Sequence, residues 1–200
     1  METDELIAAL AADDTAPKRP RLVWRLLPGA VVSVILMALF WGVRPDWGQA
    51  VQNLPVLTKQ GLPVVLLLLA ALLLRQGAPG RKPMLGLFAG IAGAVALAWG
   101  IAVLRGGDIM GQSAWQCLLS IPVLALPMAV PLFWGLRHRV EPQPARTGMV
   151  AGLFAGAAGA AIYALHCDED SAAFFLLWYG LGIAACGVAG RIAGARLLGV

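Results

Sequence analysis

The chain has 200 residues, of which 60% are hydrophobic and 13% charged, and it carries a formal net charge of +4. A soluble domain is about 45–50% apolar and about 25% charged, so the composition excludes an ordinary soluble globular protein. The positive charge does not indicate nucleic-acid binding, because the basic residues lie in short segments between apolar runs and form no stripe interleaved with aromatic side chains. Apolar runs that are continuous rather than alternating also disfavour a membrane β-barrel.

Residues 1–20 form a polar tail that contains one apolar-patterned stretch. Thr3 suits an N-cap, and Asp4 and Glu5 fall in the first turn, where acidic side chains favour the helix dipole. Three apolar side chains share one face at helical spacing, namely Leu6, Ile7 and Leu10. A helix of about a dozen residues is not stable alone in water. The pattern therefore leaves two interpretations, a disordered solubilising tail or a helix that orders in a groove of a partner.

Six apolar runs follow the tail, and each is long enough to cross a membrane as a helix. We predict spans at 22–43, 55–74, 84–104, 114–136, 147–165 and 172–193. Backbone groups in lipid must form their hydrogen bonds internally, which helices do. The sequence thus predicts an all-α membrane protein with two parts, a short cytoplasmic N-terminal tail at 1–20 and a six-helix transmembrane bundle at 21–200. Because the tail is acidic and no small-residue cleavage site follows the first run, we expect no cleavable signal peptide.

The charges predict the orientation of the bundle. With the N-terminus inside, 12 of the 15 Lys and Arg residues lie on the inner side, and only Arg44, Lys59 and Arg105 lie on the outer side. Such an excess of basic residues marks the cytoplasmic side. We therefore expect a multi-pass protein of the bacterial inner membrane with both termini in the cytoplasm.

Two further patterns concern helix packing. The segments GLFAGIAGA at 86–94 and GLFAGAAGA at 152–160 repeat one small-residue pattern, which predicts close helix contact, inside the molecule rather than in a dimer. The fourth span contains Pro122, Pro127 and Pro131, and prolines remove backbone hydrogen bonds and bend helices.

Two cysteines are the candidate chemical groups. Cys117 lies in the first turn of the fourth span, where the helix dipole favours a thiolate. Cys167 lies in an acidic outer loop, HCDED, whose acids should oppose a thiolate. Because both lie at outer ends of neighbouring spans, we expect the two cysteines to meet there. A disulfide would form if their Cα atoms approach to about 4.4–6.8 Å. Alternatively Cys117, Cys167 and His166, with Asp168 or Asp170, would bind a soft metal ion, although the spacing matches no recognised metal motif. A third interpretation is two unrelated small apolar residues.

Three segments carry a family resemblance, TDELIAALAAD at 3–13, WQCLLSIP at 115–122 and HCDEDSAAFFLLWYG at 166–180. Set in six apolar runs, they resemble the NrsF-like family of bacterial inner-membrane anti-sigma factors over essentially the full chain. The resemblance implies a regulator rather than an enzyme, with no cofactor and no direct contact with nucleic acid. Its partner would be an extracytoplasmic-function sigma factor, held by the tail and released under oxidative or heavy-metal stress.

The same resemblance implies roles for individual residues. Cys117 and Cys167 would be the paired, outward-facing sensor cysteines, and a soft metal ion would be an alternative signal at Cys117, Cys167 and His166. His166, Asp170 and Trp178 would support the sensor loop. The tail residues that would contact the sigma factor are Thr3, Asp4, Glu5, Leu6, Ile7 and Leu10.

Two rival functions fit the sequence less well. A membrane thiol oxidoreductase would use the same cysteines, but such enzymes normally contain a C-x-x-C pair, and this chain has none. A small membrane transporter would need ionisable groups deep in its spans, and none lies deep in a predicted span.

Overall fold

The computed structural model describes residues 3, 22–76, 80–139 and 141–199, and this part of the chain is helical without strands. Its helices are α2 (Leu22–Phe40), α3 (Trp47–Ala50), α4 (Leu54–Gln76), α5 (Arg81–Leu104), α6 (Ala114–Leu136), α7 (Pro144–Tyr163) and α8 (Ala172–Leu197). The predicted all-α class is confirmed. The sequence did not predict α3, a single turn between α2 and α4.

Five helices are long and apolar enough to cross a membrane, namely α4, α5, α6, α7 and α8. A further apolar helical stretch, Leu26–Phe40, lies in α2. Helix ends differ from the predicted ones by a few residues. For example, α7 begins at Pro144 rather than at 147, because proline is favoured in the first turn of a helix, where no N–H is needed.

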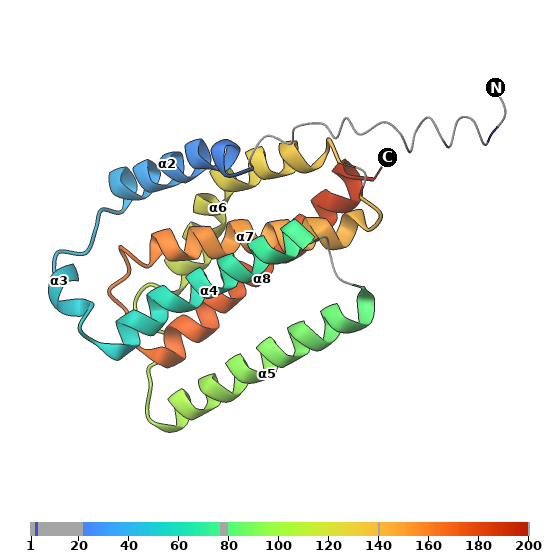
Figure 1. Cartoon of the computed structure of the whole chain (residues 1–200). Coiled ribbons are helices and arrows are strands. Elements are labelled where there is room, and N and C mark those ends of the chain that lie inside the picture. Colours follow the sequence, from blue (N-terminus) through green and yellow to red (C-terminus); the bar gives the residue numbers. More distant parts are fainter. Residues whose placement is uncertain (1–2, 4–21, 77–79, 140, 200) are drawn as a thin grey trace.

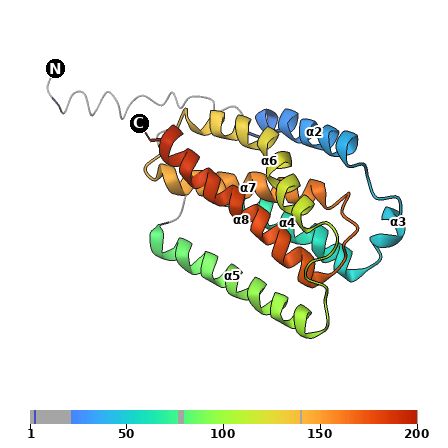
Figure 2. The ribbon, with the colours of Figure 1, turned by 180° about the vertical axis from the view of Figure 1, so that it is seen from behind.

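Successive long helices run in opposite directions, so their ends gather at two ends of the bundle (Figure 1). Gln76, Leu136 and Leu197 end α4, α6 and α8 at one end. The opposite end holds α3, the α5–α6 connection and the α7–α8 connection. The long helices α7 and α8 pack closely at the centre, α4 and α6 flank them, and α2 packs on α6 (Figure 2).

A glycine in α2 allows close contact with the proline-rich helix α6, which bends along its length (Figure 2). Pro131 has no N–H to donate to the carbonyl of Pro127. A Cβ atom on Gly29 would collide with that carbonyl oxygen, so only glycine allows α2 to approach here. Ser33, one turn further along α2, donates to the carbonyl of Leu124 at 2.8 Å. The two contacts join α2 to the middle of α6.

The two copies of the small-residue pattern behave differently. In α7, Gly152 and Gly156 lie against α8 so closely that a Cβ on either would collide with Cys186. In α5, Gly86, Gly90 and Gly93 have nothing within 4 Å of an added Cβ. The expected close contact inside the molecule therefore holds for 152–160 and is wrong for 86–94. The helix α5 packs mainly along α8, and an apolar cavity of about 500 Å³ lies between α5 and helices α4, α7 and α8.

This difference predicts the effect of two equivalent substitutions. Gly152→Ala should lower the free energy of unfolding by about 1–3 kcal/mol, because overpacking forces the α7 and α8 backbones apart. The matched control, Gly86→Ala, should leave stability unchanged or raise it, since alanine favours a helix by about 0.5–1 kcal/mol over glycine. Denaturant unfolding of both variants in detergent micelles measures the difference. Equal loss of stability in both variants would contradict the packing described here.

Candidate functional site

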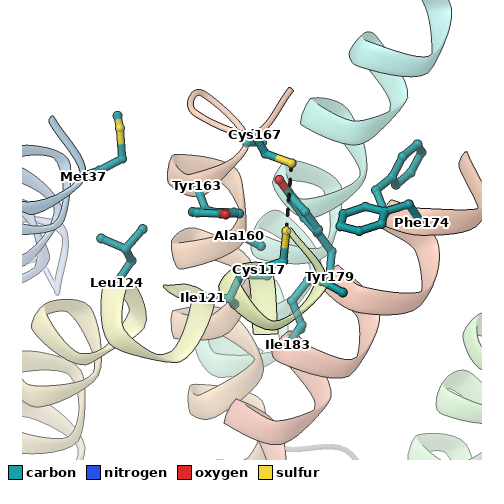
Figure 3. Packing of buried hydrophobic residues seen from close by; sticks show 13 residues of the cluster. Met37, Cys117, Ile121, Leu124, Ala160, Tyr163, Cys167, Phe174, Tyr179 and Ile183 are labelled. Atoms are coloured by element: carbon teal, nitrogen blue, oxygen red, sulfur yellow. Dashed lines mark hydrogen bonds between the residues drawn. The ribbon is translucent and has the colours of Figure 1, made fainter. Parts of the chain in front are cut away.

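The two cysteines meet at the end of the bundle that holds the α7–α8 connection. Cys117 lies at the start of α6, where its N–H donates to the carbonyl of Ser113 at 2.9 Å, and Cys167 lies in the α7–α8 connection. Their Sγ atoms are 4.0 Å apart (Figure 3). Both are free thiols, and their residues are only 0% and 2% exposed. The structure thus brings together two residues that are far apart in the sequence.

Aromatic side chains enclose the thiol pair. Tyr163, Phe174 and Tyr179 are buried in the same cluster as the two cysteines. Figure 3 shows the Tyr179 hydroxyl pointing toward the sulfur atoms. Within the described residues, the hydroxyls of Tyr163 and Tyr179 are buried and have no hydrogen-bond partner. The thiols therefore lie in a buried, largely aromatic site, and the Ser113 hydroxyl is 3.8 Å from the Cys117 Sγ.

Hydrogen bonds tie the α7–α8 connection to the α5–α6 connection, and so place Cys167 over Cys117. The Glu169 carboxylate accepts from the backbone N–H of Gln112 at 2.6 Å. The Ser171 hydroxyl donates to the carbonyl of Asp108 at 2.6 Å. Asp108 itself caps the turn before α6 by accepting from the N–H of Met110 at 3.0 Å.

A buried lysine from α4 holds the cysteine-containing connection from the other side. Lys59 is 1% exposed. Its Nζ donates to the carbonyl oxygens of Cys167 at 2.7 Å and Glu169 at 3.0 Å. It also forms an ion pair with Asp170 at 2.8 Å. These contacts fix the backbone on both sides of residue 168.

An arginine completes this ionic cluster. The Arg44 guanidinium binds Asp170 through two nitrogens at 2.9 and 3.2 Å, and it binds Asp46 at 2.7 and 2.8 Å. The Arg44 backbone N–H donates to the carbonyl of Leu165 at 3.1 Å. Sequence reasoning counted Lys59 and Arg44 only as outer charges. The available signal was a lysine inside the first turns of an apolar span, where an unpaired charge is costly.

The surroundings of the pair favour the negative charge on Cys167. A hydrogen bond from the Cys117 thiol lowers the pKa of Cys167 to about 6, the positive charge of Lys59 acts in the same direction, and burial opposes both. Burial raises the pKa of Asp170, but Arg44 and Lys59 outweigh it and hold that pKa below its ordinary value. The expectation that the loop acids would oppose a thiolate at Cys167 was wrong, because two cations neutralise Asp170.

The other predicted loop residues support the connections rather than contact the sulfurs. The ring of His166 lies 5.6 Å from that of Tyr163, and its Nδ1 is 3.2 Å from the carbonyl oxygen of Gly42. Trp178 donates from Nε1 to the carbonyl of Ile109 at 2.9 Å. Across residues 22–76, 80–139 and 141–199, no group of three or more His, Cys, Asp and Glu side chains is arranged to hold a metal ion. The metal set of Cys117, Cys167 and His166 stays a prediction.

The predicted partner-binding tail is almost entirely outside the described residues. This applies to Asp4, Glu5, Leu6, Ile7 and Leu10, whereas Thr3 is exposed.

Comparison with known proteins gives a consistent result. The model of the NrsF family, "Negative regulator of sigma F", matches residues 6–199. The chain is 36% identical to the anti-sigma-F factor NrsF of Caulobacter vibrioides (strain NA1000 / CB15N), over 99% of each chain. It is 30% identical to the probable anti-sigma-F factor NrsF of Azospira oryzae (strain ATCC BAA-33 / DSM 13638 / PS), again over 99% of each. No solved structure matches the chain. The resemblance seen in the sequence is thus confirmed, and the chain belongs to the NrsF family of anti-sigma factors, which are regulators and not enzymes.

Proposed function

We propose that this protein sequesters an extracytoplasmic-function sigma factor through its N-terminal tail and releases it when Cys117 and Cys167 react under oxidative or heavy-metal stress. The observation that carries the proposal is the pair of buried thiols, 4.0 Å apart, in a chain of an anti-sigma family. A short distance between the sulfurs and a Cys167 pKa lowered to about 6 support a role as a redox pair.

The proposed location is the bacterial inner membrane, with α2 as a sixth span beside the five long apolar helices. Exposed basic residues support the orientation, since Arg75, Lys82, Arg137 and Arg196 lie at or near the helix ends opposite the thiols. By the positive-inside rule that end faces the cytoplasm. The thiol site then faces the periplasm, where disulfides form and persist.

Oxidation by a peroxide would proceed in two steps. The Cys167 thiolate attacks one oxygen of hydrogen peroxide, gives a sulfenic acid and releases hydroxide, which takes up a proton. The Cys117 sulfur then attacks the sulfenic sulfur, the disulfide forms, and a second water leaves with the thiol proton. The net reaction converts two thiols and one peroxide into one disulfide and two waters. The sulfurs must close from 4.0 Å to about 2.05 Å, so at least one of the two cysteines must change its position.

The energy of this step is sufficient for a switch. Changing a bound population from 99:1 to 1:99 requires about 5.5 kcal/mol. A dithiol oxidation supplies about 1.4 kcal/mol per 30 mV of driving potential, so about 120 mV is enough.

Capture of a soft metal ion is a second candidate signal, and the sulfur separation favours it. Two thiolates that bind one ion at about 2.3 Å each accommodate a 4.0 Å separation without approaching one another. This reaction needs no oxidant. It would leave the sulfurs near their present positions, with the thiol protons released to solvent.

The tail supplies the test of the anti-sigma role. The triple variant Leu6→Asp, Ile7→Asp, Leu10→Asp should lose the sigma factor that copurifies with the full-length protein, because it places charge on the face proposed to dock in the partner. The matched control, Ala8→Asp, Ala12→Asp, Thr15→Asp, adds the same charge on the opposite face and should retain the sigma factor. Mass spectrometry of the affinity-purified complexes identifies the partner. Sigma factor retained by the first variant, or lost equally from both, would contradict the tail as the binding segment.

A further inference from the structure

A buried lysine, Lys59, does more in the described structure than neutralise the charge of Asp170. Lys59 of α4 is 1% exposed, and a lysine ammonium has three N–H donors. All three have acceptors, and every acceptor belongs to residues 167–170: the carbonyls of Cys167 and Glu169 and the carboxylate of Asp170. A third helix thus holds the segment that carries one sulfur over the other.

We propose that Lys59 is the positioning residue of the thiol pair and holds the Cys167 backbone so that its sulfur faces Cys117. This inference rests on the proposed sensor function and deepens it. Lys59 does not itself take part in the reaction between the two sulfurs. It acts through the carbonyl oxygens on either side of residue 168.

Comparison with Arg44 separates positioning from charge balance. Arg44 already binds both oxygens of Asp170 and so can compensate that carboxylate by itself. It reaches the Cys167 carbonyl only at 3.4 Å, whereas Lys59 reaches it at 2.7 Å. The Glu169 carbonyl is bonded by Lys59. Beyond the positive charge that lowers the pKa of Cys167, Lys59 therefore contributes the two short hydrogen bonds that hold the backbone of the connection.

The consequence is kinetic and thermodynamic. Two groups held in reacting geometry behave as if each were present at a high effective concentration. Without Lys59, the 167–170 segment keeps its bonds to Arg44 and Gln112 but loses those to α4. The sulfurs then sample a wider range of separations, and disulfide formation slows.

The test uses the full-length protein in lipid nanodiscs, with Cys186→Ser so that only the pair reacts. Diamide is the oxidant, and its N=N bond takes up the two electrons and two protons of the thiols. Lys59→Met should form the disulfide at least tenfold more slowly than the parent. The reaction is measured by labelling the remaining thiols with a maleimide that shifts gel mobility. Lys59→Arg, which restores donors to the same carbonyls, should recover most of the rate. Arg75→Met, an exposed cation at the other end of α4, should match the parent.

Equilibration against dithiothreitol measures the reduction potential of the pair, which a merely structural role of Lys59 would not change. A tenfold loss of effective concentration raises the reduction potential of the pair by about 30 mV. An unchanged rate and potential in a folded Lys59→Met protein would overturn the proposal, as would an equal change in Arg75→Met. If Lys59→Met does not fold, Lys59→Gln carries the same comparison, since its shorter uncharged side chain cannot reach all three acceptors.

The assay contains no sigma factor, so it separates this inference from the proposed function. Slow oxidation in Lys59→Met supports the positioning role whatever the cysteine variants do to sigma-factor release. Unchanged release in the cysteine variants would exclude the sensor function alone. Normal oxidation in Lys59→Met with cysteine-dependent release would remove the positioning role alone.

Discussion

Serine in place of either Cys117 or Cys167 is expected to keep the sigma factor bound under an oxidant that releases it from the parent protein. One thiol alone cannot form the intramolecular disulfide, so release should fall to the level seen without oxidant. The measurement is the fraction of sigma factor that stays on immobilised full-length protein after treatment with diamide. A sigma-dependent reporter in cells gives the same comparison.

Cys186→Ser is the matched control, because Cys186 lies in α8 outside the thiol pair. It should release the sigma factor as the parent does. Treatment with cadmium in place of diamide distinguishes the two proposed signals. If metal capture is the signal, cadmium should release the sigma factor from the parent protein although no disulfide is seen on a gel. Undiminished release from the Cys117→Ser, Cys167→Ser double variant by both treatments would exclude the pair as the sensor.

Asp170→Ala is expected to be the most destabilising single change at the site. It leaves Lys59 and Arg44 buried with one anionic partner fewer. Breaking a fully buried ion pair from one side typically costs about 3–5 kcal/mol, and because the Asp170 side chain is 34% exposed the loss should lie near the lower end of that range. The lowered pKa of Asp170 means that this stabilisation is present at neutral pH and is lost on acidification through that pKa. Thermal and denaturant unfolding of the reduced protein in nanodiscs measure both effects.

Asp168→Ala provides the control, because it removes the same charge from the same connection. Asp168 is exposed and takes part in no ion pair within the described residues. Its free energy of unfolding should change by no more than about 0.5 kcal/mol. Similar losses in the two variants would show that the cluster around Asp170 is not the source of stability.

The sequence predicted the apolar helices well, because a run of about 20 apolar residues reports directly on the need for internally bonded backbone in lipid. It also predicted that Cys117 and Cys167 meet, since alternating helix directions place both at one end. It did not predict the role of Lys59 or Arg44. Apart from Asp46, which lies two residues from Arg44, their partners lie more than 100 residues away. No local pattern encodes which distant acceptor a buried cation will find.

The repeated glycine pattern shows the same limit. GLFAG at 86 and at 152 is identical over five residues, yet only the second copy is covered by a neighbouring helix. A face of small residues allows another helix to approach closely, whereas the arrangement of the other helices decides whether one does. The expectation that the loop acids oppose a thiolate at Cys167 was wrong for a related reason, because the sign of a local electrostatic effect depends on cations contributed by distant segments.

The contacts of Gly29 and Ser33 with α6 have a mechanical consequence. Cys117 stands at one end of α6, and the points where α2 is fastened, Leu124 and Pro127, lie two to three turns further along the same helix. Any tilt that closes the sulfurs therefore pulls on α2, the helix that follows the N-terminal tail directly. Under the proposed topology, the contacts of Ser33 and Gly29 would connect the thiol site on one side of the bilayer to the tail on the other.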